Sequence, residues 1–392
     1  MVTPPPGCDL VVVGGGILGL AVARELRSRR PAATITVLER EASVGTGQTG
    51  RNSGVVHGGI YYAPGSLKAR LCVEGARLLY DYCDERGVRY ERCGKLIVAR
   101  HAGELPRLDE LDRRGRENGV PGLRRLGGEE LREIEPHARG VAALHSPQTG
   151  VVDFGAVARA LADELGERDT PVVTGCGVRG VAQIPGRNVL RHEQGETRAR
   201  FTVFCAGLEA HRLAMAAAAD PEPRIVPFRG AYLYLAPARR SLVRGLIYPV
   251  PDPALPFLGV HLTRHIGGEV SLGPTALLWP RGPGDVLWPG TLHMATRWWR
   301  TGLRELRHAT SRRAFAAQAA EYVPELRPED FERGFSGVRA QALSRDGRLV
   351  DDFVLSQSER ALHVRNAPSP AATSALAIAR LICERVVSLA SV

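Results

Sequence analysis

The chain has 392 residues, of which 44% are hydrophobic and 24% are charged, so it should fold as two domains or one elaborated α/β unit. No run of eighteen apolar residues occurs, which excludes a membrane-spanning helix, and residues 1–8 lack the segments expected of an export signal. The net charge is +10, and 50 of the 52 basic residues are arginine because only Lys68 and Lys95 are lysine. The arginines are scattered rather than gathered with aromatic residues, which argues against nucleic-acid binding and fits an acidic small molecule.

The seven cysteines are odd in number and show no CxxC spacing, so neither a zinc site nor a disulfide framework is expected. We expect reduced, mostly buried thiols in a cytoplasmic protein, and no metal.

Residues 9–39 carry a complete dinucleotide-binding pattern. A buried strand over 9–13 leads into Gly14, Gly16 and Gly19, a helix follows, and a second strand over 34–38 ends on Glu39. Gly14 permits the tight turn, Gly16 the close approach of the pyrophosphate, and Gly19 the packing of helix on strand. The pyrophosphate should sit at the helix N-terminus and Glu39 should accept hydrogen bonds from the ribose. Ile17, Leu18 and Arg40 are assigned to the same site.

A second small, polar loop follows over residues 46–54. A nicotinamide cofactor has little use for another close backbone approach directly after the ribose acid, whereas the longer FAD needs one. This loop therefore favours FAD, with contacts expected from Gln48, Thr49, Asn52, Ser53 and Gly54.

Longer segments resemble the L-2-hydroxyglutarate oxidase/dehydrogenase family, within the wider D-amino-acid-oxidase-like group of flavoproteins. The matching text is QTGRNSGVVHGGIYYAPGSLKA (48–69), CGKLIVA (93–99), VPFRGAYLYL (226–235), IYPVPDPALPFLGVHLTR (247–264), GVRAQALSRDGRLVDDF (337–353) and NAPSPAATSALAIA (366–379). The resemblance implies a two-domain FAD oxidoreductase that removes hydride from C2 of L-2-hydroxyglutarate and yields 2-oxoglutarate. Either oxygen or a quinone is expected to take up the electrons.

The expected fold class is α/β plus α+β, with a Rossmann-like FAD-binding domain and a second, mainly antiparallel-sheet substrate domain. Residues 1–88, 148–215 and 330–392 are assigned to the FAD-binding domain, and residues 89–147 and 216–329 to the substrate domain. A buried strand is predicted over 201–207, antiparallel strands over 224–273, and a helix over 370–387. Further cofactor contacts are expected from Val178, Ala206, Gly207, Arg339, Ser369, Pro370, Ala371, Ala372 and Thr373.

Oxidation of a 2-hydroxy acid requires a base for the hydroxyl proton and a cation for the carboxylate. His57 and His261 are the two candidate bases, and the sequence does not choose between them. Arg229 is the predicted clamp for the carboxylate, because a guanidinium binds a carboxylate in a bidentate manner, although an interface salt bridge would also explain it. Lys95, on an apolar strand, is placed near substrate or reduced flavin, with a buried ion pair as the alternative.

Four further residues are assigned to the substrate pocket. Tyr61, Tyr62 and Tyr232 could donate phenolic hydrogen bonds, though packing alone would also explain them, and Thr275 completes the set. Lys68 is expected on the helix that begins after residues 64–66.

Three positions depart from the family pattern: Ala231, Thr275 and the segment 281–285. If they line the pocket, the substrate could differ, so oxidation of another amino acid or amine-type small acid is kept as the alternative function.

Residues 292–307 place Trp298 and Trp299 among four arginines, a pattern found in interfacial helices that contact a membrane. The competing interpretation, a helix packed within the substrate domain, is favoured here. Peripheral contact with the inner membrane face remains the second option for localisation.

Overall fold

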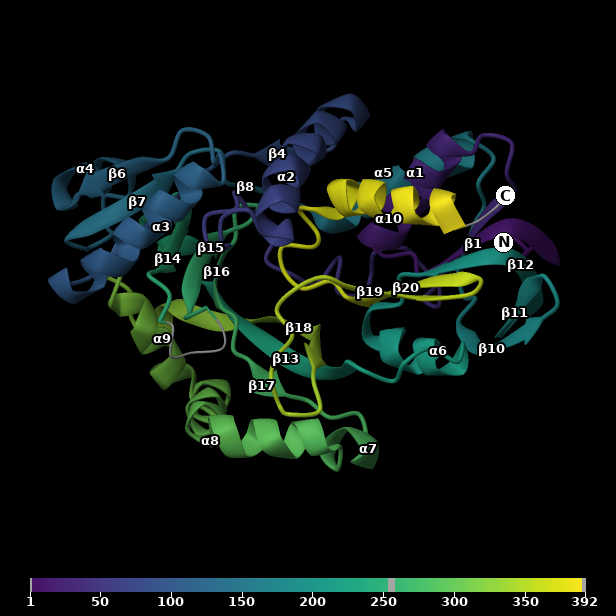
Figure 1. Cartoon of the computed structure of the whole chain (residues 1–392). Helices are drawn as coiled ribbons and strands as arrows, with labels where there is room; N and C mark the ends of the chain where they lie inside the picture. Colours follow the sequence, from purple (N-terminus) through teal and green to yellow (C-terminus); the bar gives the residue numbers. More distant parts are fainter. Residues whose placement is uncertain (1, 253–257, 390–392) are drawn as a thin grey trace.

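The computed structural model describes residues 2–252 and 258–389, and within these ranges the chain forms three β-sheets and ten α-helices (Figure 1). Residues 253–257 of the family-like segment 247–264 lie outside the described residues.

The first sheet, called the nucleotide sheet here, is built around the N-terminal strand. Its strands are β10 (Val178–Ile184), β11 (Arg187–His192), β12 (Gly195–Phe204), β1 (Gly7–Val13), β2 (Ile35–Leu38) and β9 (Val172–Val173), in that order, with β20 (Ala361–Asn366) on β12 and β19 (Val354–Ser358) on β20. Strand β1 runs parallel to β2 and β12, and β12 runs parallel to β20. The apolar run over 10–13 is buried on both faces, as a central parallel strand requires.

The second sheet, called the substrate sheet here, is mostly antiparallel. Its order is β17 (Leu277–Leu278), β13 (Arg224–Leu235), β16 (Val270–Gly273), β15 (His261–Arg264), β14 (Leu246–Pro249), β5 (Lys95–Ala99), β7 (Ala142–Ser146) and β6 (Arg124–Gly127), with β18 (Phe331–Leu343) along β13. Strands β5 and β14 form a parallel pair within it. A small third sheet joins β3 (Val55–Val56), β8 (Gly150–Val152) and β4 (Tyr90–Glu91).

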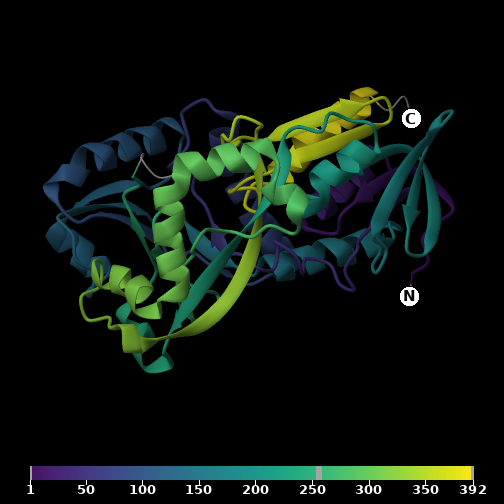
Figure 2. The ribbon, with the colours of Figure 1, turned by 90° about the horizontal axis from the view of Figure 1, so that it is seen from below.

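The helices cover the two large sheets. They are α1 (Ile17–Arg29), α2 (Leu67–Arg86), α3 (Leu105–Glu117), α4 (Gly128–Ile134), α5 (Phe154–Glu167), α6 (Ala210–Ala216), α7 (Pro283–Val286), α8 (Pro289–Thr310), α9 (Arg312–Ala320) and α10 (Ala375–Leu389). Helices α1, α5 and α10 lie on one side of the nucleotide sheet and α6 on the other (Figure 1). Figure 2 shows α7, α8 and α9 as an arm along the outer side of β13 and β18. No helix among the described residues is long and apolar enough to cross a bilayer.

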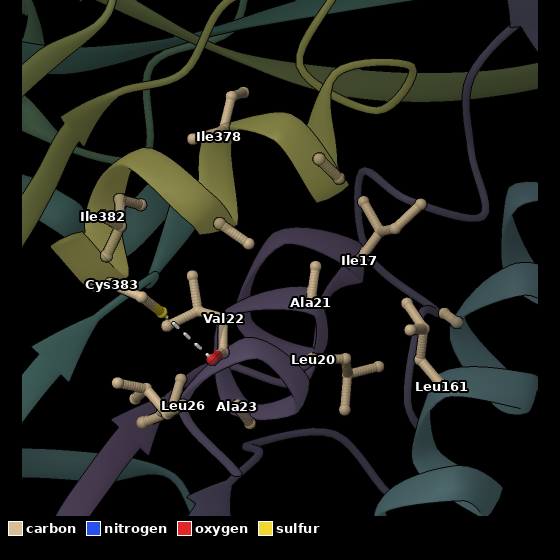
Figure 3. Close-up of a cluster of buried hydrophobic side chains, with 14 of the residues drawn as sticks. Ile17, Leu20, Ala21, Val22, Ala23, Leu26, Leu161, Ile378, Ile382 and Cys383 are labelled. Atoms are coloured by element: carbon tan, nitrogen blue, oxygen red, sulfur yellow. Dashed lines mark hydrogen bonds between the residues drawn. The ribbon is translucent and has the colours of Figure 1, made fainter. Parts of the chain in front are cut away.

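Helix α1 is packed between α5 and α10 by a stripe of small and aliphatic side chains (Figure 3). Leu20, Val22 and Leu26 are fully buried, and the Cys383 thiol of α10 donates to the Val22 carbonyl at 3.6 Å. The stripe holds the N-terminus of α1 against the end of β1, where the cofactor is expected. All seven cysteines are free.

The predicted division of the chain differs from the sheets at one strand. Every strand of the nucleotide sheet falls within the segments assigned to the FAD-binding domain. Strand β18 was assigned there as well, yet it pairs with β13 over its whole length and belongs to the substrate sheet. After β18, the chain therefore re-enters the nucleotide sheet at β19. The C-terminal helix also begins later than predicted, at Ala375, because residues 369–374 form turns.

Candidate active site

A cavity of about 1050 Å³ runs between the nucleotide sheet and the substrate sheet. One end is lined by residues that follow β1, β2 and β12, where the carboxyl ends of parallel strands meet. The other end is lined by side chains of β13, β14, β15 and β18. All of the predicted FAD-binding residues line this cavity except Gly54.

The glycine turn after β1 has the close contacts that the sequence pattern predicts. Gly14 has a φ of +115°, and a Cβ atom there would lie 2.3 Å from the carbonyl oxygen of Cys205. A Cβ atom on Gly19 would lie 1.9 Å from the carbonyl oxygen of Gly14. The N-cap Gly16 offers no side chain to the first turn of α1; the N–H of Ile17 donates to Thr49, and the N–H groups that follow it have no side-chain partner among the described residues and are available to a pyrophosphate.

Glu39 lies in the cavity wall beside this turn, and the backbone holds its orientation. One carboxylate oxygen accepts a hydrogen bond from the N–H of Gly15 at 2.5 Å, and the other from the N–H of Glu41 at 2.7 Å. Each oxygen keeps lone-pair capacity for a ribose hydroxyl. The turn, the open helix terminus and this acid together fit the adenosine diphosphate part of FAD.

The second glycine loop is tied to both halves of the structure. Thr49 Oγ1 accepts from the N–H of Ile17 at 3.1 Å, and Gln48 Oε1 accepts from the N–H of Ala340 on β18 at 2.8 Å. Gly54 does not line the cavity, contrary to the prediction. Its φ is +71° and a Cβ atom there would lie 2.8 Å from the Val152 carbonyl oxygen, so it shapes the turn into β3.

The turn before α10 also lines the cavity. Thr373 is buried, and its hydroxyl accepts from the N–H of His57 at 3.1 Å and donates to the Val55 carbonyl at 3.3 Å. The C-terminal segment thereby fixes the loop that carries His57.

Both candidate bases, His57 and His261, line the cavity. Burial lowers the pKa of His57 well below its usual range, and the charges of Lys95 and Arg339 add to this effect. Burial likewise lowers the pKa of His261 to about 3. Both imidazoles are therefore neutral at pH 7 and able to accept a proton.

The hydrogen bonds of the two rings distinguish them. His261 Nδ1 lies 2.9 Å from the Gly259 carbonyl oxygen, and a neutral ring must donate from Nδ1 there, which leaves Nε2 with a free lone pair. The ring also stacks on Tyr248, with centroids 3.9 Å apart. His57 Nδ1 is buried and has no hydrogen-bond partner within residues 2–252 and 258–389, so this nitrogen makes no bond there that would fix the tautomer.

Arg229 does not reach the cavity, contrary to the prediction. In the ladder of β13 and β18, Gly230 pairs with Gly337, and side chains alternate between the two faces. Arg229 lies on the outer face, where its Nη2 bonds Ser336 at 3.3 Å and its guanidinium covers the ring of Trp279. Arg339 lies on the inner face, lines the cavity, and acts electrostatically on both candidate bases.

Arg339 is the better candidate for holding a carboxylate. Its guanidinium forms no hydrogen bond or ion pair within residues 2–252 and 258–389, although the sequence analysis placed it among the flavin contacts. Lys95 was placed near the substrate, but it is fully buried and does not line the cavity.

The three predicted tyrosines, Tyr61, Tyr62 and Tyr232, all line the cavity. Tyr62 lies beside Lys68, whose ammonium is 5.0 Å from its ring centroid and 2.8 Å from a carboxylate oxygen of Asp351. Lys68 is on α2, which Ser66 caps, as the sequence predicts. Sequence reasoning missed Tyr248 and Asp351 as cavity residues, although both lie in family-like segments.

The three departures from the family pattern lie outside the cavity wall. Ala231 shares the outer face with Arg229, and Thr275 is buried with its hydroxyl accepting from the Ala231 N–H at 3.0 Å. In the segment 281–285, Arg281 pairs with Glu209 at 2.6 Å, at the nucleotide end of the molecule. The prediction that Thr275 binds substrate is therefore wrong in this geometry.

Comparison with known proteins identifies the family of the chain. The family model for FAD dependent oxidoreductases of the DAO type matches residues 9–385. The chain is 44% identical to the human mitochondrial L-2-hydroxyglutarate dehydrogenase over 96% of its own length and 88% of that protein. It is 40% identical to the L-2-hydroxyglutarate dehydrogenase of Indibacter alkaliphilus over 96% of this chain and 98% of the relative.

The fold is shared with solved flavoproteins. An L-α-glycerophosphate oxidase from Mycoplasma pneumoniae, with FAD bound, superimposes with a TM-score of 0.79 at 22% identity, covering 95% of this chain and 93% of the other. A glycine oxidase from Geobacillus kaustophilus gives 0.72 at 19% identity, covering 98% and 95%. The chain belongs to the DAO family of FAD-dependent oxidoreductases.

Proposed function

We propose that the protein oxidises L-2-hydroxyglutarate at C2 to give 2-oxoglutarate. The observation that carries the proposal is the inner end of the cavity, where an unpaired arginine and a neutral histidine face the same space. Near-full-length identity of 40–44% to L-2-hydroxyglutarate dehydrogenases supports the choice of substrate. The departures at Ala231, Thr275 and 281–285 do not alter the cavity wall, which weakens the case for an amine or another acid.

The cofactor and three cavity residues have separate roles in this reaction. When bound, FAD supplies the acceptor for the hydride that leaves C2. Arg339 holds the C1 carboxylate, and the Nε2 lone pair of His261 accepts the hydroxyl proton. His57 also lines the cavity, and its N–H bonds the Thr373 hydroxyl, which holds the loop that carries His57 against the turn before α10.

Anaerobic bleaching of the flavin absorbance tests the substrate. Rapid bleaching by L-2-hydroxyglutarate, with little or none by its D enantiomer, is the expected result. Bleaching by a 2-amino acid or another hydroxy acid in its place would contradict the proposal.

We infer further that electrons leave at a membrane surface, through the exposed face of α8. Trp299, Leu303 and Leu306 are between 46% and 57% exposed and, at spacings of four and three residues, share one face of the part of α8 that follows Trp298, where the helix is kinked; Leu292, which is 49% exposed, lies before the kink. The arginines of this helix are exposed and form no ion pair among the described residues. These arginines are Arg297, Arg300, Arg304 and Arg307. An apolar stripe beside free cations suits an anionic bilayer and a quinone acceptor.

The helix is kinked at Trp298. The ring of Trp298 packs inward, whereas Trp299 is exposed. The interpretation favoured from the sequence, a helix packed within the substrate domain, therefore holds for Trp298 and not for Trp299. Flotation with anionic liposomes tests the surface. The wild type should float, and a Trp299→Ala/Leu303→Ala double variant should not. A matched Ile184→Ala/Met215→Ala variant, which removes exposed apolar side chains elsewhere, should behave like the wild type. If the wild type does not float with the liposomes, the proposed membrane contact of α8 is wrong.

A further inference from the structure

Lys95 is a buried cation without a counter-ion. Its side chain is 1% exposed at the start of β5, and within residues 2–252 and 258–389 its ammonium forms no hydrogen bond and no ion pair. Nζ lies 4.7 Å from the ring centroid of Tyr61 and 4.7 Å from that of Tyr248. A charge in this position is costly unless something else compensates it.

The two rings separate Lys95 from the cavity. Tyr61 and Tyr248 both line the cavity, and Tyr248 stacks on His261. Lys95 therefore lies directly behind the wall that carries the proposed base. Cation–π contacts with aromatic faces retain part of the stabilisation that an acid would have given.

The groups that face Lys95 from neighbouring elements carry no negative charge. Burial raises the pKa of the Cys72 thiol on α2 to about 12, and burial raises the pKa of both tyrosines. The candidate bases are neutral. The cavity near these rings is also lined by Lys68, Arg339 and the acid Asp351, and by two cations and two acids of α3 and the segment after β14, namely Arg107, Arg114, Glu110 and Asp252.

With Lys95 included, five cations face three acids, which leaves a surplus of two positive charges (5 − 3). We propose that Lys95 is a positioning residue whose buried charge makes this end of the cavity selective for a substrate with two carboxylates. Arg339 binds one carboxylate directly, and Lys95 attracts the dianion through the aromatic wall without touching it. This inference rests on the proposed function and assigns a source for its specificity.

The charge of Lys95 also affects when a cavity histidine of low proton affinity accepts the hydroxyl proton. In the empty site, burial is the main cause that disfavours protonation of His57 and His261, and the charges of Lys95 and Arg339 add to it. A bound dianion offsets both cations, so the proton affinity of the base rises when substrate arrives. The base is thereby kept in its neutral form until it is needed.

A Lys95→Met variant, purified with FAD, tests the inference. Rates of anaerobic bleaching would be compared for L-2-hydroxyglutarate, a dianion, and L-2-hydroxypentanoate, a monoanion of the same chain length. We expect the preference for the dianion in kcat/KM to fall about tenfold or more, and the acid limb of the kcat/KM profile to move to higher pH. An unchanged preference in a variant with normal flavin content would overturn the inference.

A double variant, Lys68→Met/Asp351→Asn, is the matched control. It removes one cation and one anion from the same end of the cavity, so the preference should change much less than in Lys95→Met. An equal fall in both would show that net charge is not the cause.

The wild type gives a second test that does not depend on a variant folding. Burial lowers the pKa of Lys95 to about 8, so the preference for the dianion should decline between pH 7 and pH 9. A constant preference across that range contradicts the inference. If neither acid bleaches the wild type, the proposed function fails instead, and the two failures are distinguishable.

Discussion

The choice between Arg339 and Arg229 can be tested by neutralising each in turn. The two arginines lie on opposite faces of the same two-stranded ladder, and the register places Arg339 opposite Phe228, the residue before Arg229. Arg339 has no partner among the described residues, so Arg339→Met should leave the fold and the flavin content intact. Arg339 is exposed to the cavity, and a hydrogen bond to a charged group contributes about 1.5–3 kcal/mol.

At 1.36 kcal/mol per decade, losing this contribution corresponds to a rise of about tenfold or more in the concentration of L-2-hydroxyglutarate that half-saturates flavin bleaching. Arg229→Met removes a surface contact with Ser336 and Trp279, and it should change the same quantity by less than about threefold. Stopped-flow bleaching of both variants under anaerobic conditions measures the difference. Equal effects, or a larger effect at Arg229, would refute the assignment of the inner face.

Three further results are expected. Gly19→Ala should lower the unfolding temperature and release FAD, because its Cβ would lie 1.9 Å from the Gly14 carbonyl oxygen, whereas Gly166→Ala, with nothing within 4 Å, should do neither in a melting experiment that follows flavin fluorescence. His261→Asn should reduce kcat by about 100-fold or more while FAD remains bound, and a loss below tenfold would move the base to His57. Burial lowers the pKa of His363 to about 4, so between pH 6.5 and pH 4 the unfolded chain binds more protons and stability falls as the pH falls. Urea titrations across this range should show His363→Gln losing up to about 1.4 kcal/mol per pH unit less than the wild type, and parallel curves would count against this account.

The nucleotide end of the site could be predicted from the sequence because its determinants are local. Gly14, Gly19 and Glu39 lie within about thirty residues of one another, and each acts through its own backbone or the adjacent strand end. Their contacts depend on strand, turn and helix following in that order, which the apolar pattern shows directly. The role predicted for Gly54 is the exception. A glycine that is needed for a positive φ and a glycine that is needed for a close cofactor contact look the same in a sequence.

The substrate end depends on which face of a strand each side chain occupies, and this cannot be obtained from one strand alone. Strand β13 has an irregular register between Ala231 and Leu233, and its pairing with β18 joins segments about one hundred residues apart. A shift of one residue exchanges the two faces, so Arg229 and Arg339 are equivalent candidates until the ladder is known. The same geometry removes Ala231 and Thr275 from the pocket, although they interrupt a family motif. A change within a motif therefore alters the substrate only where the register turns that side chain inward, and here Tyr232 of β13 and Arg339 of β18 are residues that line the cavity.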